Sequence, residues 1–338
     1  MKRILVINVN WLGDVIFSSP VFKALKETYP DAHISCMAVP RVKDVLESIP
    51  QIDEIILYDE KGRHWNPLAK LKFILELRRK HFDSAFLLHR SWTRALLIYC
   101  AGIPVRVGYD EKKRGWFLTH KVNYPDVPVH RSDYYLNIIE SYGIPINDRQ
   151  CRLNVSDEAK NDIEKILKLN NIDKNQYLII LNPGGNWDLK RWPLENFSRL
   201  IRGLVGSSEV KIVISGAQKD IILAKELNSM AFKNVIHLTG QTSLKQLMAL
   251  MKRANLTISA DSGPLHLANS VGCDVIGVYG PTRPEITGPR GSGRKYILQH
   301  DIGCNREPCY HLKCPDNVCM QSVTASDVIE IINEIRNP

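Results

Sequence analysis

Short apolar runs alternate with stretches of helical spacing along almost the whole chain. In the first half, these runs fall at residues 3–9, 33–39, 54–59 and 84–89. In the second half, they fall at residues 177–185, 210–216, 235–240, 255–259, 274–280 and 296–300. Near-continuous apolar runs of this length are typical of strands that are covered on both faces. The alternation of strands and helices therefore predicts an α/β protein built from doubly wound parallel sheets.

The length of the chain predicts two domains, because 338 residues exceed what one typical hydrophobic core encloses. The alternation pauses after a helical stretch near 131–142 and restarts at 177–185. We therefore expect one Rossmann-like domain over residues 1–153 and a second over residues 154–322, with a ligand cleft between them. Residues 105–125 are basic and irregular in pattern, so we expect a surface loop there.

The stretch SADSGPLHLANSVGCDVIGVYGPTRP (259–284) predicts a ligand-binding unit of strand, turn, helix and strand. A turn through Asp261, Ser262 and Gly263 joins a β-branched run to the helix. Free N–H groups at such a helix N-terminus, beside the carboxyl end of a parallel strand, suit a phosphate or diphosphate. Asp261 and His266 would flank this group. The alternative is that Asp261 and Ser262 only cap the helix and that His266 is a buried core histidine.

Two other predicted strands end in polar or small residues. Gly184, Gly185 and Asn186 form a turn directly after one strand. Lys190 follows this turn, where a lysine can supply a point charge to a phosphate. Asp220 lies just inside the helix that follows the next strand.

The first predicted strand leads through Gly13 to Asp14. Glycine permits a tight turn, and Asp14 lies where a helix begins, so its carboxylate would face the crevice above the sheet. The alternative is that Asp14 is an N-cap and nothing more. No G-x-G-x-x-G turn follows this strand, and the sequence has no G-x-x-x-x-G-K-[ST] segment. These absences argue against a dinucleotide dehydrogenase and a P-loop ATPase.

The net charge of +9 favours an anionic partner. Residues 1–150 hold 22 Lys plus Arg against 17 Asp plus Glu, and the remainder holds 23 against 19, so both halves share the surplus. The segment 61–81 is the most basic, although a solvated helix face accounts for most of its residues. No zinc-finger or RNP-type signature accompanies the charge, so we do not expect nucleic acid as a partner.

Four of the eight cysteines recur at intervals of five near the C-terminus, at Cys304, Cys309, Cys314 and Cys319. Structural zinc sites usually use cysteine pairs with roughly two to four residues between them, and this pattern has none. We therefore expect no metal site. The sequence gives the four thiols no role.

The sequence also bears on the compartment. It has no apolar run of about 18 residues, so we expect no membrane-spanning helix. The N-terminal run MKRILVINV is typical of a strand rather than of a signal peptide. We therefore expect a cytoplasmic protein, in which reduced thiols are the default.

Four unlike motifs occur in order along the chain. They are NWLGDVIFSSP (10–20), NPGGNWDLKRWP (182–193), SGAQKD (215–220) and the stretch at 259–284. The set resembles glycosyltransferase family 9, the ADP-heptose:lipopolysaccharide heptosyltransferases, and its first and last motifs look closest to the heptosyltransferase II type. The resemblance implies a GT-B architecture with an N-terminal acceptor domain and a C-terminal nucleotide-sugar domain. It also implies a last helix, residues 323–338, that returns toward the first domain.

The resemblance implies metal-independent transfer of heptose from ADP-heptose, with inversion at the anomeric carbon and without a cofactor. Asp14 matches the family's general base, which would take the proton of the acceptor hydroxyl. Lys190 matches the lysine that neutralises the departing diphosphate. Asp261 matches an acid that contacts the donor sugar or ribose. The expected donor-binding residues are Gly184, Gly185, Asn186, Lys190, Asp220, Asp261, Ser262, Gly263 and His266.

For the acceptor, the resemblance implies an anionic, lipid-linked saccharide. The residues expected to bind it are Gly13, Arg63, Arg90, Arg94 and Arg114, of which Arg114 has a fair motif match. Peripheral contact with the cytoplasmic face of the inner membrane is a hypothesis that rests on the positive charge and this acceptor. Three alternatives stay open: a transferase that uses another nucleotide sugar, an epimerase of the same fold, and a non-catalytic nucleotide-sugar-binding protein.

Overall fold

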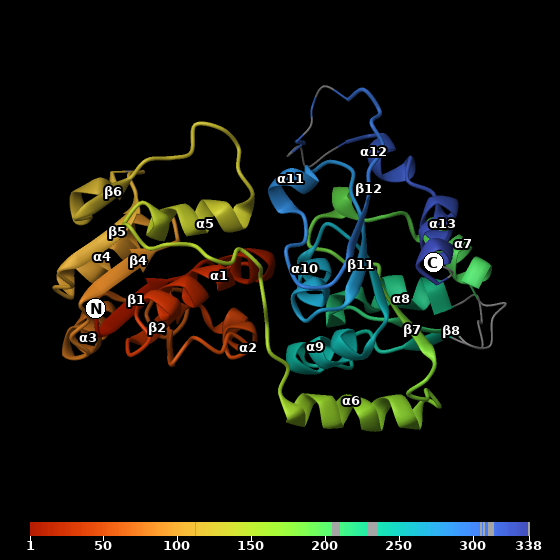
Figure 1. The fold of residues 1–338 in the computed structure, drawn as a ribbon, viewed down its shortest axis with the longest axis horizontal. Helices are drawn as coiled ribbons and strands as arrows, with labels where there is room; N and C mark the ends of the chain where they lie inside the picture. The colour runs from red at the N-terminus through yellow and green to blue at the C-terminus, as the bar shows by residue number, and fades with distance from the viewer. Residues whose placement is uncertain are drawn as a thin grey trace. The chain divides into compact units, whose positions relative to one another are not determined.

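Two six-stranded parallel sheets, each with helices on both faces, make up the computed structural model (Figure 1). The chain divides into two units, Met1–Asn154 and Val155–Pro338, beside the boundary expected between residues 153 and 154. The residues that the structure describes are 1–111, 113–204, 210–228, 235–304, 306, 308–309 and 314–336.

The first unit has the strand order β3-β2-β1-β4-β5-β6. Its strands are β1 (Arg3–Ile7), β2 (His33–Ala38), β3 (Glu54–Leu57), β4 (Ser84–Leu87), β5 (Val105–Tyr109) and β6 (His120–Val122). Its helices are α1 (Leu12–Thr28), η1 (Pro40–Val42), α2 (Lys43–Leu46), α3 (Pro67–Arg79), α4 (Trp92–Cys100), η2 (Arg114–Phe117) and α5 (Arg131–Glu140). Because β1 pairs with both β2 and β4, the order reverses there, and the ends of these strands form the usual place for a ligand.

The second unit repeats this plan with the order β12-β11-β10-β7-β8-β9. Its strands are β7 (Tyr177–Asn182), β8 (Val210–Ile214), β9 (Val235–His237), β10 (Leu256–Ala260), β11 (Asp274–Val278) and β12 (Lys295–Leu298). Its longer helices are α6 (Asp157–Leu169), α7 (Leu194–Leu204), α8 (Ile221–Asn228), α9 (Leu244–Arg253), α10 (Gly263–Ser270) and α13 (Ala325–Arg336). Its short ones are η3 (Asp188–Lys190), η4 (Gln218–Asp220), α11 (Pro284–Thr287) and α12 (Val318–Gln321).

The expectation of an irregular loop over residues 105–125 is wrong. This segment contains β5 and β6, which extend the first sheet at one edge. Arg106 interrupts the apolar alternation of β5, and this hid the strand in the sequence. In the structure its guanidinium donates to the carbonyl oxygens of Phe117 and Ile103. These backbone acceptors stabilise the charged side chain beside the strand.

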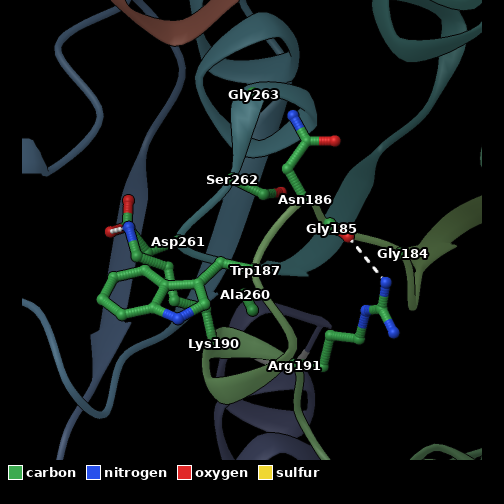
Figure 2. A pocket seen from close by; sticks show the side chains of 10 residues that line it. All are labelled: Gly184, Gly185, Asn186, Trp187, Lys190, Arg191, Ala260, Asp261, Ser262 and Gly263. Atoms are coloured by element: carbon green, nitrogen blue, oxygen red, sulfur yellow. Dashed lines mark hydrogen bonds and ion pairs between the residues drawn. The ribbon is translucent and has the colours of Figure 1, made fainter. Parts of the chain in front are cut away.

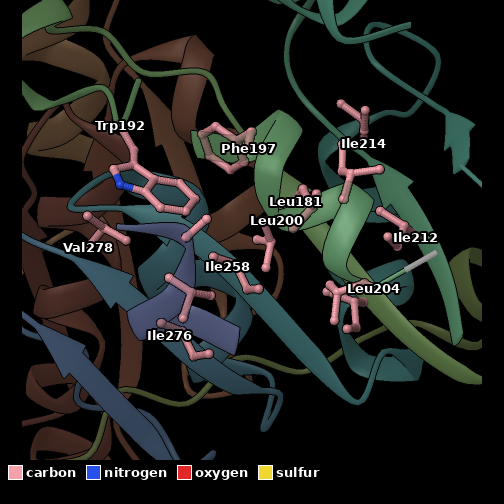
Figure 3. Close-up of a cluster of buried hydrophobic side chains, with 14 of the residues drawn as sticks. Leu181, Trp192, Phe197, Leu200, Leu204, Ile212, Ile214, Ile258, Ile276 and Val278 are labelled. Atoms are coloured by element: carbon pink, nitrogen blue, oxygen red, sulfur yellow. The ribbon is translucent and has the colours of Figure 1, made fainter. Parts of the chain in front are cut away.

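One hydrophobic cluster of the second unit lies between its sheet and the helices α7, α8 and α13, and Figure 3 shows its α7 and strand residues. Trp192 is buried there, and its indole Nε1 donates to the carbonyl oxygen of Val323 at 2.8 Å. Val328 and Ile332 of α13 belong to the same cluster, so this last helix packs in the second unit. Its expected return toward the first unit stays a prediction.

Leu200→Ala should destabilise the second unit by about 2–5 kcal/mol, because Leu200 is fully buried and its loss leaves a cavity. Urea unfolding followed by circular dichroism measures the change. The matched control is Leu169→Ala at the exposed end of α6, which should change the free energy of unfolding by less than about 0.5 kcal/mol. Equal unfolding midpoints for the two variants would contradict the described core.

Candidate functional site

A pocket opens at the carboxyl ends of β7 and β10 in the second unit (Figure 2). It is lined by Gly184, Gly185, Asn186, Trp187, Lys190, Arg191, Ala260, Asp261, Ser262 and Gly263. The structure thus brings together most of the residues expected to bind the donor. Those that do not line this pocket are Asp220 and His266, which lie behind its wall.

Lys190 and Asp261 form an ion pair in the wall of the pocket. The ammonium Nζ of Lys190 donates to Asp261 Oδ2 at 2.6 Å, and the Asp261 side chain is almost fully buried. The ammonium also lies 5.3 Å from the ring centroid of Trp187 (Figure 2). An ammonium has three donors, and this pairing uses one of them. Lys190 therefore keeps donors for an anion while Asp261 fixes its position.

Asp261 joins three further side chains. Thr282 Oγ1 and Thr287 Oγ1 donate to its Oδ2 at 2.7 and 3.1 Å, and His266 Nε2 lies 3.3 Å from its Oδ1. Burial alone raises the pKa of this carboxyl group, but the contacts with His266 and Lys190 outweigh burial and hold the pKa well below its usual range. Asp261 is therefore a carboxylate that joins the loops after β10 and β11.

The N-terminus of α10 faces the pocket without a side-chain cap. Ser262 occupies the N-cap position, yet its side chain accepts no hydrogen bond from the helix backbone. Its hydroxyl instead lies 3.0 Å from that of Ser259. Simple capping therefore does not explain Ser262, and both Ser262 and Gly263 line the pocket. Such a helix end carries a partial positive charge that suits an anion.

Gly184 is required by the close approach of Asp220. A Cβ on Gly184 would lie 2.5 Å from the carboxyl carbon of Asp220, which is too close for any side chain. Asp220 Oδ2 accepts the backbone N–H of Ala217 at 2.9 Å and so caps its own turn. Asp220 therefore supports the loop at Gly184 from behind.

Trp187 and Arg191 were missed as pocket residues in the sequence. The Nη2 of Arg191 donates to the carbonyl oxygen of Gly185 at 2.8 Å, which closes the loop around the pocket. Both residues lie within the motif at 182–193, so their position beside Lys190 was the available signal.

In the first unit, Gly13 and Asp14 lie in the first turn of α1, above the end of β1. The phenol of Tyr135, on α5, donates to Asp14 Oδ1 at 2.8 Å, and Arg131 Nε lies 4.0 Å from the same oxygen. Burial and the negative charge of Asp14 raise the pKa of Tyr135 well above its usual value, so Tyr135 stays a donor. The Asp14 carboxylate remains partly exposed.

Two of the expected acceptor arginines are fully buried. Arg94 donates to the carbonyl oxygen of Asn8 at 3.0 Å and to Asn10 Oδ1 at 3.1 Å. Arg114 Nε donates to the carbonyl oxygen of Tyr109 at 2.7 Å. Burial lowers the pKa of both guanidinium groups. These side chains hold strand ends in place, and neither presents its charge at the surface in this structure.

The other two expected acceptor arginines are exposed. Arg90 forms an ion pair with Glu111, which also accepts the phenol of Tyr124. Arg63 is exposed in the turn before α3. The first unit therefore offers Arg63 and Arg90, rather than all four arginines, to a ligand in solution.

The four cysteines near the C-terminus are free thiols. The backbone N–H of Cys309 donates to the carbonyl oxygen of Pro281 at 2.7 Å, and Cys319 packs against the core of the second unit. Within the described residues, no three His, Cys, Asp or Glu side chains are grouped as metal ligands. No described helix is long and apolar enough to span a membrane.

The chain matches the family described as "Glycosyltransferase family 9 (heptosyltransferase)" over residues 70–317. It is 27% identical to Lipopolysaccharide heptosyltransferase 2 of Escherichia coli strain K12, over 85% of each chain. It is similar to the solved glycosyl transferase family 9 of Veillonella parvula, with 26% identity and a TM-score of 0.84 over 97% of this chain and 95% of that one. The structure titled "E. coli heptosyltransferase WaaC with ADP" shares the fold, with 20% identity and a TM-score of 0.76 over 98% and 99% of the two chains.

These likenesses confirm the resemblance stated from the motifs and the predicted fold class, two Rossmann-like sheets of the GT-B type. They also favour a transferase over an epimerase or a non-catalytic binding protein. The family match spans more than half of the chain and includes every residue that lines the pocket. The chain therefore belongs to glycosyltransferase family 9, the heptosyltransferases.

Proposed function

We propose that this chain transfers a heptose from ADP-heptose to a lipid-linked, inner-core lipopolysaccharide acceptor. The names of its relatives support the substrates, since one is a lipopolysaccharide heptosyltransferase and another was solved with ADP. The reaction inverts the anomeric carbon and uses neither a metal ion nor a cofactor. The observation that carries the proposal is the pocket in which Lys190 and the N-terminus of α10 line the same space.

The second unit binds the donor through its diphosphate. Lys190 and Asp261 together carry no net charge, so attraction to an anion comes from the remaining donors of Lys190, from Arg191 and from the open helix end. The backbone of Gly184 and Gly185 lines the opposite wall of the same pocket. As the bond to the heptose breaks, negative charge grows on the departing ADP, and these fixed donors stabilise it.

The first unit supplies the base and meets the acceptor. Asp14 takes the proton from the acceptor hydroxyl as this oxygen attacks the anomeric carbon. Tyr135 orients the Asp14 carboxylate, and the partly exposed edge of Asp14 is open to the acceptor. Gly13, which lies beside Asp14 in the first turn of α1, contacts the acceptor, and the exposed Arg63 and Arg90 bind its anionic groups. Arg94 and Arg114 act indirectly, through the loops that they hold.

Asp14→Asn should lower turnover by about two to four orders of magnitude, because the amide keeps the shape of the side chain but cannot accept the proton. ADP affinity should stay within about twofold of the wild type. Mass spectrometry of the acceptor measures transfer, and calorimetry measures ADP binding. Asp44→Asn, in the first turn of α2, is the matched control and should keep full turnover. Equal loss of ADP affinity and turnover in Asp14→Asn would remove Asp14 from the base role.

Lys190→Ala should weaken ADP binding roughly tenfold to a hundredfold, since it removes a charged donor to the diphosphate. Asp261 keeps Thr282, Thr287 and His266 as partners, so the fold should persist. Lys174→Ala is the matched control, because Lys174 is exposed and precedes β7, at the other end of the sheet from the pocket. Unchanged ADP affinity in Lys190→Ala, with native circular dichroism, would contradict the donor site.

A further inference from the structure

Helix α3 of the first unit carries an apolar stripe on its outer side. The side chains of Leu68, Leu71 and Leu75 are 73%, 52% and 42% exposed. Their spacing of three and four residues places them on one face of the helix. Phe73 and Leu77 of the same helix are buried in the core of the first unit. Helix α3 is thus apolar on two sides, and packing within the unit accounts for only one of them.

Trp65 lies directly before the N-cap of α3 and is 69% exposed. The turn that carries it is fixed by its neighbour His64, which is buried and stacks on Tyr58 with ring centroids 5.2 Å apart. His64 Nδ1 also accepts the backbone N–H of Asp59 at 3.0 Å. Trp65 is therefore presented to solvent by an anchored turn.

Basic side chains accompany the stripe on the same helix and in the turn before it. Those exposed on α3 and in the turn before it are Lys61, Arg63, Lys72, Arg78 and Arg79. Glu76 is the one acidic residue of α3, and the turn before it carries Asp59 and Glu60. A surface with apolar side chains at its centre and Lys and Arg at its rim complements an anionic lipid headgroup layer.

The distribution of tryptophan distinguishes the two units. The exposed tryptophans of the described residues, Trp11, Trp65, Trp92 and Trp116, all belong to the first unit. In the second unit, Trp192 is buried in the core and Trp187 lines the donor pocket. Tryptophan is enriched at membrane–water interfaces, where its ring lies at the level of the headgroups.

We propose that Trp65, Leu68, Leu71 and Leu75, the α3 patch, dock this enzyme on an anionic lipid bilayer. The leucines insert at the boundary between headgroups and acyl chains, and the surrounding Lys and Arg side chains bind lipid phosphates. A second copy of the chain is a poorer occupant, because it would place two basic rims against each other.

Docking here would bring the acceptor-binding edge of the first unit to the membrane, an extension that rests on the proposed function. Glu60, in the turn that carries Trp65, accepts a hydrogen bond from Arg94 at 3.3 Å. Arg94 also donates to the carbonyl oxygen of Asn8, just after β1. The same buried arginine thus links the docking turn to the strand end that leads to Asp14.

Co-sedimentation with phosphatidylcholine vesicles, with and without phosphatidylglycerol, tests the α3 patch without any substrate. The wild type should bind the anionic vesicles and dissociate as salt rises. The variant Trp65→Ser/Leu68→Gln/Leu71→Gln/Leu75→Gln should bind them at least about tenfold more weakly. Lys72→Gln/Arg78→Gln/Arg79→Gln should lose binding to the anionic vesicles by a similar factor.

Matched controls come from the second unit. Leu169→Gln/Ile222→Gln replaces apolar side chains that are more exposed than those of the α3 patch, and Lys165→Gln/Lys168→Gln/Lys174→Gln removes the same number of charges as the basic α3 variant. Both should bind vesicles like the wild type. The inference is overturned if the α3 variants bind like these controls, or if the wild type does not bind anionic vesicles. It is also overturned if analytical ultracentrifugation shows that the α3 patch joins two copies of the chain.

ADP calorimetry on the same samples separates this inference from the proposed function. The α3 variants should keep wild-type ADP affinity, and urea unfolding followed by circular dichroism checks that the first unit, which carries the substitutions, is still folded. Vesicle binding through the patch without heptose transfer would leave the docking inference standing and contradict the proposed function. Transfer to a soluble acceptor without vesicle binding would support the proposed function and contradict the docking inference.

Discussion

A buried carboxylate at the end of β10 organises the donor pocket. Asp261 binds Lys190 from the loop after β7 and Thr282 and Thr287 from the segment after β11. A buried carboxylate is costly unless it is paired and hydrogen-bonded, so these segments are held where its partners must be. Lys190 is thereby positioned before any ligand binds, so the reaction needs no further reorganisation of this side chain.

In the first unit, buried cations rather than a buried anion hold the loops at the strand ends. Arg94 and Arg114 are buried at the ends of its central strands and donate to backbone oxygens there. Each guanidinium holds backbone at the edge of the sheet where Asp14 lies. The two units thus share a sheet plan, while one anchors its loops on a buried anion and the other on buried cations.

The sequence predicted the sheets well, because strands covered on both faces give apolar runs that stand out from their surroundings. It also predicted most of the pocket wall, since Gly184 lies at the end of one such run, Lys190 follows soon after it, and Ser262 lies in the turn after another. The bond between Tyr135 and Asp14 could not be predicted, because these residues are 121 positions apart and neither flanks the other's motif.

The burial of charged side chains also could not be predicted from the sequence. Arg94 lies at the start of a helix. Its contacts with Asn8, Asn10 and Glu60, which only the fold brings together, explain why it is buried. Arg106 hid β5 for a related reason, because its backbone partners are seen only in the fold. The exposed stripe of α3 could not be predicted either. Apolar residues lie on two faces of this helix, and the sequence does not tell which face is buried.

The central claim is that the pocket around Lys190 and α10 binds the ADP part of a heptose donor. Calorimetric titration of the purified wild-type protein with ADP, UDP and GDP tests it most directly. The account predicts that ADP binds at least about tenfold more tightly than the other two, a difference of about 1.4 kcal/mol. Preferential binding of UDP or GDP, or binding of none of the three, would contradict it.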